Sequence, residues 1–377
     1  MEVGPEPLQE SQGGAHRMTK LKVIDLFCGA GGFSEGFSQM GFDVTYAIDN
    51  WNPALVAHKA NQPEAETVKA DIGVLDPKQF PRPDVLIGGP PCTEFSGSKR
   101  GGGGDFAKGM RLVLAFFKFV QVLKPRWWVM ENVPRLLQTL PPRVKLSEMG
   151  FHDDGVLEIP RRHVFNSADF GAPQKRTRLL SGRYPSPIQT HFEEPALTLE
   201  NIAYQSWVPM RKVIEAFPSP IDRVPNGVVH DPNYPLSLPA GELEDHFMKP
   251  EDALMSRAEA ERNKKQKVAH AFYGKMKFPD DLDRPSRTVM ATQFNASRET
   301  MVIECRYRGE TRYRKPTVRE CASMQTYPIT YKFPAQTMTT KYKLVGNSVP
   351  VFLSRAIARA ILLEAGEKVP AAPMIQA

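Results

Sequence analysis

Short apolar runs alternate regularly with helical segments between residues 23 and 131, and few folds are compatible with this pattern. Strand-like runs lie at 23–27, 44–49, 67–70, 84–89 and 127–131, and helix-like segments lie at 33–40, 53–60 and 106–123. Such alternation is typical of parallel strands that helices cover on both faces. We therefore predict an α/β fold with a doubly wound, mostly parallel sheet, to which two later β-like runs at 155–159 and 178–181 belong.

The regular pattern ends near Tyr184. From there to Pro279 prolines are frequent, charges are mixed and no repeat occurs, which indicates a second, smaller and irregular domain. Helical periodicity returns at 349–364, where we expect Ser348 as the N-terminal cap and Pro350 in the first turn. A chain of 377 residues is long enough for two domains.

Composition excludes several classes of protein. No apolar run reaches the ~18 residues of a membrane span, and residues 1–20 lack the apolar core of a secretory signal. The four cysteines (Cys28, Cys92, Cys305 and Cys321) have no metal-ligand spacing, so we expect no metal site and a reducing cytoplasm.

The net charge of +7 is mild, but basic residues gather between Cys305 and Val345. Nine lysines and arginines stand there against two glutamates: Arg306, Arg308, Arg312, Arg314, Lys315, Arg319, Lys332, Lys341 and Lys343. Such a cluster either faces a phosphate backbone or is an ordinary solvated surface, and the sequence leaves both readings open.

Polar residues follow the predicted strands one after another. Asp25 and a glycine turn (Gly29-Ala30-Gly31-Gly32) follow the first strand, and Asp49, Asp71, Pro90-Pro91-Cys92 and Glu131-Asn132 follow the next four. Ligands of open α/β sheets bind beyond the carboxyl ends of the strands, so we expect these groups to converge on one edge.

The glycine turn and Asp49, 20 residues after Gly29, are spaced as in nucleotide-binding units, where an acid binds ribose hydroxyls. Ser34 stands where a dinucleotide fingerprint has its third glycine. The turn therefore favours a nucleoside without phosphates, such as S-adenosylmethionine. A purely structural turn is the alternative.

Cys92 follows two prolines that fix the backbone, which favours a functional thiol over a structural one. Glu131, after the adjacent strand, is an available acid or hydrogen-bonding group. Arg176 and Arg178 fall on the same side of an extended segment and are suited to bind phosphate or orient a base, although a solvated basic run is the alternative.

Six ordered blocks resemble the DNA cytosine-C5 methyltransferases, of the bacterial restriction–modification type without large regulatory domains. The resemblance covers roughly residues 20–365, except the middle. The blocks are Asp25-Leu-Phe-Cys-Gly-Ala-Gly-Gly-Phe33, Gly89-Pro-Pro-Cys92 with Phe95-Ser96, Glu131-Asn-Val133, Gln174-Lys-Arg-Thr-Arg178, Arg319-Glu-Cys321 with Gln325 and Tyr327-Pro328, and Gly346-Asn-Ser-Val349.

The resemblance implies a role for each matching residue. Cys92 is the expected nucleophile, Glu131 its partner at the base, and Arg176 and Arg178 the arginines near the cytosine. The expected cofactor residues are Phe27, Gly29, Gly31, Asp49, Asn50, Asp71, Ile72, Pro91, Asn347 and Ser348. Ser96 and Ser98 are expected to approach DNA. The candidate base readers are Arg287, Gln293, Asn295 and Arg298, and for each of them an ordinary surface position is the favoured alternative.

The resemblance also implies a Rossmann-like cofactor-binding domain at 20–184 and a target-recognition domain at 185–332. A segment at 333–366 is expected to return to the first domain. The two ends of the chain, a disordered tail at 1–19 and a tail at 367–377, lie outside these domains. Two positions depart from the family: Asp49 replaces a frequent glutamate, and Asn50 stands where a bulky apolar residue often stacks on adenine, with Trp51 next to it.

The implied activity is sequence-specific methylation of cytosine C5 in duplex DNA, with S-adenosylmethionine as donor, S-adenosylhomocysteine as product, and a covalent Cys92–C6 intermediate on a flipped-out base. We expect a monomer that binds double-stranded DNA and no membrane, in the bacterial cytoplasm at the nucleoid. An RNA cytosine methyltransferase and a catalytically silent DNA-binding protein are the alternatives.

Overall fold

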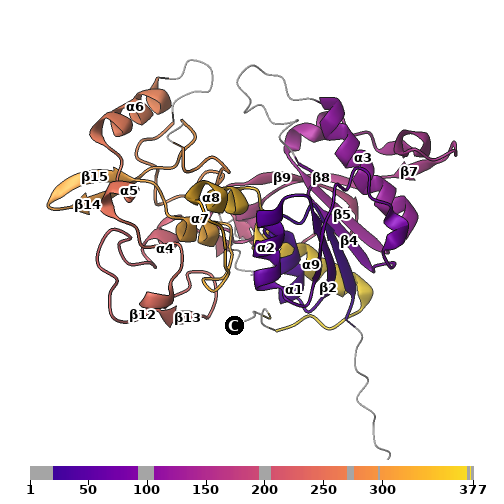
Figure 1. Cartoon of the computed structure of the whole chain (residues 1–377), viewed down its shortest axis with the longest axis horizontal. Helices are drawn as coiled ribbons and strands as arrows, with labels where there is room; N and C mark the ends of the chain where they lie inside the picture. The colour runs from indigo at the N-terminus through magenta and orange to yellow at the C-terminus, as the bar shows by residue number, and fades with distance from the viewer. Residues whose placement is uncertain are drawn as a thin grey trace, which may run out of the picture.

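The computed structural model describes residues 20–91, 106–194, 205–269, 276–295, 298–371 and 374. Its centre is a seven-stranded sheet with the order β3-β2-β1-β4-β5-β9-β8, and its first five strands are parallel (Figure 1). The strands are β1 Lys22–Leu26, β2 Asp43–Asp49, β3 Glu66–Lys69, β4 Val85–Gly88, β5 Trp127–Asn132, β8 Arg161–Asn166 and β9 Thr177–Arg183. Strand β9 runs antiparallel to both of its neighbours, β5 and β8. The sheet is therefore mostly but not entirely parallel, and the predicted α/β fold is confirmed.

Helices cover both faces of this sheet, as the buried central strands β4 and β5 require. Trp127 and Trp128 are neighbours on β5 and therefore face opposite sides, each 1% exposed. Trp127 packs with α1 and α9, and Trp128 with α3. The helices of this half are α1 Gly32–Gln39, α2 Asn52–Asn61, α3 Phe106–Leu123 and α9 Val351–Ala365.

Three local predictions were wrong or incomplete. The run at 155–159 forms β7 Val156–Glu158, which pairs with β6 Arg143–Lys145 in a separate hairpin and not with the main sheet. Strand β8 was missed because it lies at the sheet edge, half exposed, and carries no buried apolar run. The last helix begins at Val351, and Pro350 precedes it; the Ser348 hydroxyl donates to the Leu344 carbonyl and is not the cap.

Residues 205–346 form an irregular region beside the sheet half (Figure 1). Its elements are short: β11 Gln205–Ser206 (paired with β10 His191–Phe192), α4 Arg211–Ile214, β12 Val228–His230, β13 Ser237–Pro239, α5 Pro250–Ala253, α6 Arg257–Val268, β14 Ile303–Tyr307, β15 Glu310–Arg314, α7 Val318–Met324 and α8 Met338–Gly346. The longest helix, α6, was missed because it has no apolar stripe. Its beginning is nevertheless readable, since the Ser256 hydroxyl accepts from the Glu259 N–H at 3.1 Å.

The two halves share a core, in which Ala54 and Ala57 of α2 pack with residues of α7 and α8. The predicted domain boundaries at 184 and 332 stay a prediction. Within the described ranges, no helix combines the length and the apolar character that crossing a membrane requires.

Candidate active site at the carboxyl edge of the sheet

The glycines of the turn after β1 differ in their surroundings: Gly31 and Gly32 are closely packed, whereas Gly29 faces open space. A Cβ on Gly31, whose φ is +90°, would lie 2.7 Å from the Tyr331 hydroxyl, and a Cβ on Gly32 would lie 2.4 Å from the Val349 carbonyl. Gly29 also has a left-handed φ of +54°, but a Cβ there would meet nothing within 4 Å. The turn is therefore packed against the C-terminal segment on one side and open at Gly29, where a ligand can approach the backbone closely.

Asp49 at the end of β2 closes this turn. Its carboxylate accepts from the Gly29 N–H at 3.0 Å and from the Trp51 N–H at 2.8 Å. Burial raises the pKa of Asp49, and the backbone hydrogen bonds oppose the rise. A carboxylate has about four acceptor sites, so two hydrogen bonds leave capacity for ribose hydroxyls.

The remaining predicted cofactor residues after β2 and β3 lie around this edge. Asn50 and Asp71 are exposed, whereas Ile72 is only 3% exposed. The half-buried Trp51 carries the Lys343 ammonium group 4.5 Å from its ring centroid. This edge is chemically suited to a nucleoside with free hydroxyls. It offers open space at Gly29, hydrogen-bond acceptors at Asp49 and Asp71, and an aromatic surface at Trp51.

A buried polar trio lies directly beneath the turn, and the sequence did not reveal it. The Ser34 hydroxyl donates to Asp25 at 2.6 Å and lies 3.1 Å from Nε2 of His58. Asp25 is 1% exposed, and its burial raises its pKa to about 7. Burial lowers the pKa of His58 to about 4. Asp25 therefore supports the turn from below and does not line the edge as expected.

The predicted base-binding acid has a partner from the neighbouring strand. Glu131 on β5 forms an ion pair with Arg178 on β9 at 2.7 Å, with side-chain exposures of 11% and 13%. A Cβ on Gly89 would lie 3.3 Å from Glu131, so the segment after β4 runs alongside this carboxylate. Asn132 fixes that segment by donating to the Pro90 carbonyl at 3.0 Å.

The exposed Pro91 is the last residue described before a gap. Cys92, Ser96 and Ser98 lie outside the described residues, and their roles stay predictions.

Arg176 and Gln174 join sequence blocks that are far apart in the chain. Arg176 is 2% exposed and donates to the carbonyls of Val289 and Gly346. Gln174 donates to Gln325 at 2.8 Å and accepts from the Val289 N–H at 2.6 Å. The two arginines thus lie in different places: Arg178 reaches Glu131, and Arg176 holds three segments together behind it.

The two cofactor residues predicted near the C-terminus also differ. Asn347 is exposed, whereas Ser348 is 6% exposed and its hydroxyl accepts from the Tyr327 hydroxyl at 2.8 Å. Phe27, next to the glycine turn, is half-buried with a φ of +57°.

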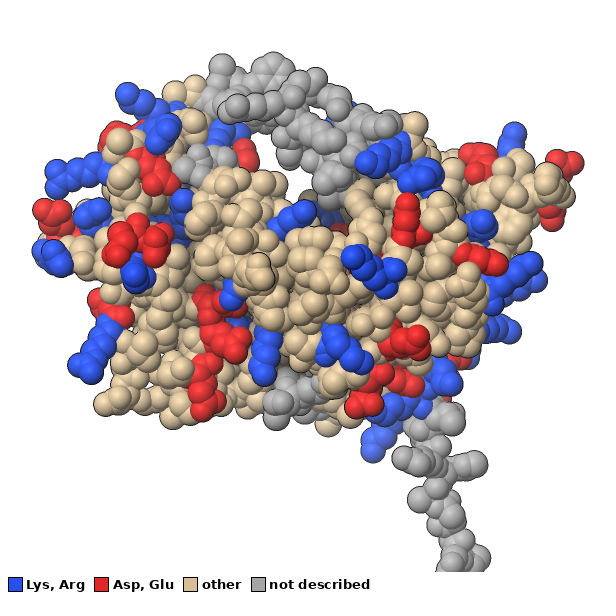
Figure 2. Space-filling view, in the orientation of Figure 1, with Lys and Arg blue, Asp and Glu red and all other residues tan. Residues whose placement is uncertain are grey.

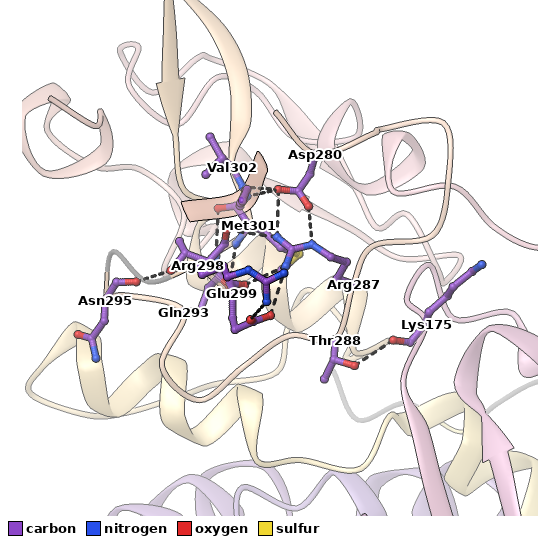
Figure 3. Close-up of polar contacts among 12 residues, drawn as sticks. Lys175, Asp280, Arg287, Thr288, Gln293, Asn295, Arg298, Glu299, Met301 and Val302 are labelled. Carbon is purple, nitrogen blue, oxygen red and sulfur yellow. Dashed lines mark hydrogen bonds and ion pairs between the residues drawn. The ribbon is translucent and has the colours of Figure 1, made fainter. Parts of the chain in front are cut away.

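The four candidate base readers lie on one loop, and polar contacts hold most of them (Figure 3). Gln293 is 1% exposed, and its amide exchanges two hydrogen bonds with the Met301 backbone. Arg287 pairs with the buried Asp280 at 2.7 Å, and Arg298 pairs with Glu299 at 3.1 Å. Asn295 is exposed, so the structure brings Asn295 to the surface and places Gln293 in the interior.

The basic cluster is not a single surface. Arg314 forms a bidentate ion pair with Glu320 in the interior, at 2.7 Å to each oxygen, and Arg319 is 1% exposed. On the face seen in Figure 2, acidic and basic side chains are interspersed over the half of the molecule that contains β14 and β15. Neither reading of the cluster as a whole is therefore correct, because part of it is internal.

The chain is similar to known proteins over most of its length. A family model described as C-5 cytosine-specific DNA methylase matches residues 21–363. Type II methyltransferase M.AgeI of Thalassovita gelatinovora is 27% identical, over 90% of this chain and 99% of the relative, and M.NgoPII of Neisseria gonorrhoeae is 28% identical, over 90% and 95%.

Two solved structures share the fold. A putative DNA modification methyltransferase from an E. coli prophage superposes with a TM-score of 0.60 and 21% identity, over 92% of this chain and 100% of the other. The S. pombe Dnmt2 methyltransferase superposes with a TM-score of 0.58 and 14% identity, over the same shares.

Proposed function

Because the chain belongs to the C-5 cytosine-specific DNA methylase family, we propose that it methylates C5 of a flipped-out cytosine in a specific duplex DNA sequence, as the modification enzyme of a restriction–modification system. The observation that supports this most directly is the Glu131–Arg178 pair, which lies beside the Gly89–Pro91 segment. The relatives that match over most of their length are named Type II methyltransferases.

S-adenosylmethionine is the proposed methyl donor, and when bound it supplies an activated methyl group on a sulfonium. The residues that would hold it are Phe27, Gly29 and Gly31 at the turn, Asp49 and Asn50 after β2, Asp71 and Ile72 after β3, and Pro91, Asn347 and Ser348 from the flanking segments. Asp49 would accept hydrogen bonds from the ribose, and the open side of Gly29 admits the ligand to the backbone.

The chemistry needs a nucleophile because C5 of cytosine is a poor carbon nucleophile in its aromatic ring. The Cys92 thiolate adds to C6, and the electron pair displaced from the C5–C6 double bond makes C5 enamine-like. C5 would take the methyl group that the bound donor supplies, with S-adenosylhomocysteine as the other product. A base then removes the C5 proton, and the electron pair of that C–H bond re-forms the double bond and expels the Cys92 thiolate.

Glu131 is proposed to bind the Watson–Crick edge of the cytosine. Its carboxyl group accepts from the exocyclic amino group and shares a proton with N3, which makes C6 more electrophilic. Arg178 holds that carboxyl group in place through the 2.7 Å ion pair. Arg176, although predicted to act at the base, is proposed to act indirectly, since its guanidinium is engaged with the Val289 and Gly346 carbonyls.

The target base must leave the stacked duplex before any of these groups can reach it, at an expected cost of a few kcal/mol. We propose that residues 185–332 hold the duplex meanwhile, with Asn295 as the best-exposed candidate reader and Arg287 and Arg298 available if their ion pairs open. Ser96 and Ser98 keep their predicted role at the DNA.

The decisive experiment measures transfer of a labelled methyl group from S-adenosylmethionine to duplex DNA and to tRNA. We expect transfer to duplex DNA only, and loss of transfer in Cys92→Ser with DNA binding retained. Transfer to tRNA alone would support the RNA-modifying alternative. Binding of DNA and cofactor without transfer would support the silent DNA-binding alternative.

A further inference from the structure

A cavity of about 400 Å³ opens on the outer side of α9, between this helix and the segments at 188–190 and 369–371. None of its lining residues belongs to the candidate active site. The lining is apolar apart from Thr190 and two arginines, Arg355 and Arg359, and it includes no carboxylate. The volume lies within the range of small-molecule sites, roughly 300–1,000 Å³.

The two arginines lie four residues apart on α9 and therefore on one face of the helix. Arg359 is exposed at the mouth, and Arg355 is half-buried. The Arg355 guanidinium lies 4.1 Å from the ring centroid of Phe352 and 6.0 Å from that of Tyr234. Burial lowers the pKa of Arg355, and the nearby Tyr234 opposes this shift.

The other arginines that are shielded from water have polar partners of two kinds. Arg314 and Arg287 pair with the acids Glu320 and Asp280, whereas the buried Arg176 and Arg319 donate to backbone carbonyls. Among the described residues, neither Arg355 nor Arg359 forms an ion pair. A half-buried cation without a counter-ion, at the wall of an apolar cavity, is complementary to a ligand that supplies both an anion and an apolar body.

We propose that this cavity is a binding site for amphipathic carboxylates, in which an aliphatic or aryl body fills the apolar space and the carboxylate pairs with Arg355. Arg359 attracts the anion at the mouth. The cavity lies apart from the carboxyl edge of the sheet, so this site is independent of the proposed methyl transfer.

The test is a calorimetric titration of the full chain with decanoate, decanol and decyltrimethylammonium, which share one chain length and differ in charge. We expect decanoate to bind at least about tenfold more tightly than decanol, as a charge-assisted hydrogen bond implies. The cationic compound should not bind. Shortening the acid to octanoate should weaken binding about fifteenfold, at about fourfold for each buried methylene.

Two variants locate the site. Arg355→Gln should lower decanoate affinity to that of decanol, and Ala356→Phe should fill the cavity and abolish binding of both. Arg126→Gln is the matched control, because Arg126 also stacks on an aromatic ring, that of Trp127 at 4.0 Å, but lines no part of the cavity. Thermal unfolding of each variant verifies that the fold is retained.

Equal affinity for decanoate and decanol would overturn the proposal, and so would an unchanged decanoate affinity in Arg355→Gln or in Ala356→Phe. Absence of any binding by the unsubstituted chain would overturn it as well. In that case Arg355 serves only to cover the apolar surface of Phe352.

Discussion

The interiors of the two halves of the molecule are built differently. The sheet half buries the apolar residues of its strands between helices, with Trp127 and Trp128 packed on opposite faces of β5. The region at 205–346 consists of short elements and, beside its own apolar core, buries paired charges such as Lys267 with Asp280 and Arg314 with Glu320. Apolar burial is not directional, whereas each buried charge of the second half depends on its individual partner being present.

Asp25 in the sheet half and Glu320 in the second half respond to pH in opposite directions, although burial also raises the pKa of Asp231 in the second half, to about 6. In the sheet half, burial raises the pKa of Asp25 to about 7 and that of Glu35 to about 6. In the second half, burial would raise the pKa of Glu320, but the Arg314 guanidinium more than offsets this and lowers it. Asp25 therefore contributes stability that is lost as pH rises, and Glu320 contributes stability that is lost as pH falls.

The largest expected effect comes from breaking the ion pair in the second half. Glu320→Ala leaves the Arg314 guanidinium buried without its partner, at 5% exposure, and should lower the free energy of unfolding by about 3–5 kcal/mol. Urea denaturation measures this. The double substitution Arg314→Met with Glu320→Leu is the control and should recover most of the loss. A loss below about 1 kcal/mol in the single variant would mean that the pair does not organise this region.

A smaller effect, of opposite pH dependence, is expected beneath the glycine turn. Asp25→Asn removes a carboxyl group whose pKa is raised in the folded protein. The unsubstituted protein therefore becomes less stable as pH rises from the pKa that this group has in the unfolded chain towards its folded pKa of about 7. Between pH 5 and pH 8 the unsubstituted protein should therefore lose about 3 kcal/mol relative to the variant. Parallel unfolding free energies across that range would contradict the burial of this acid.

The smallest effect is expected where a charge pair of the second half lies on the surface. Arg257 and Glu310 are 3.4 Å apart with side-chain exposures of 84% and 57%. Glu310→Ala should change the free energy of unfolding by less than about 0.5 kcal/mol, because solvent screens the pair. A loss comparable with that of Glu320→Ala would show that burial is not what separates the two pairs.

The same contrast explains what the sequence revealed. Strands β1, β4 and β5 and helix α3 were predictable because most of their residues are buried and the hydrophobic pattern reports burial directly. Helix α6 was not predicted because it presents charged residues on all sides and buries only Ala260, Asn263 and Lys267. The surface position of the whole basic cluster could not be predicted, because a count of basic residues along the chain does not show that Arg314 forms an ion pair with Glu320 in the interior.

The residues of the candidate site likewise differ in how far the sequence predicts their positions. Glu131 and Asp49 were identifiable because each follows a predicted strand, where the topology itself gathers ligand-binding groups. The positions of Arg176 and Gln293 were not, since their partners Gly346 and Met301 are set by tertiary packing. The contact of Ser34 with His58 likewise joins two helices whose spacing the sequence does not state.

The covalent mechanism can be tested with a duplex in which every cytosine is replaced by 5-fluorocytosine, incubated with S-adenosylmethionine. Fluorine at C5 cannot leave as a proton does, so an enzyme that adds a thiolate to C6 remains attached to the DNA. We predict a covalent protein–DNA adduct on denaturing electrophoresis, mapped by mass spectrometry to Cys92. DNA binding without an adduct, or an adduct at another residue, would contradict the proposed mechanism.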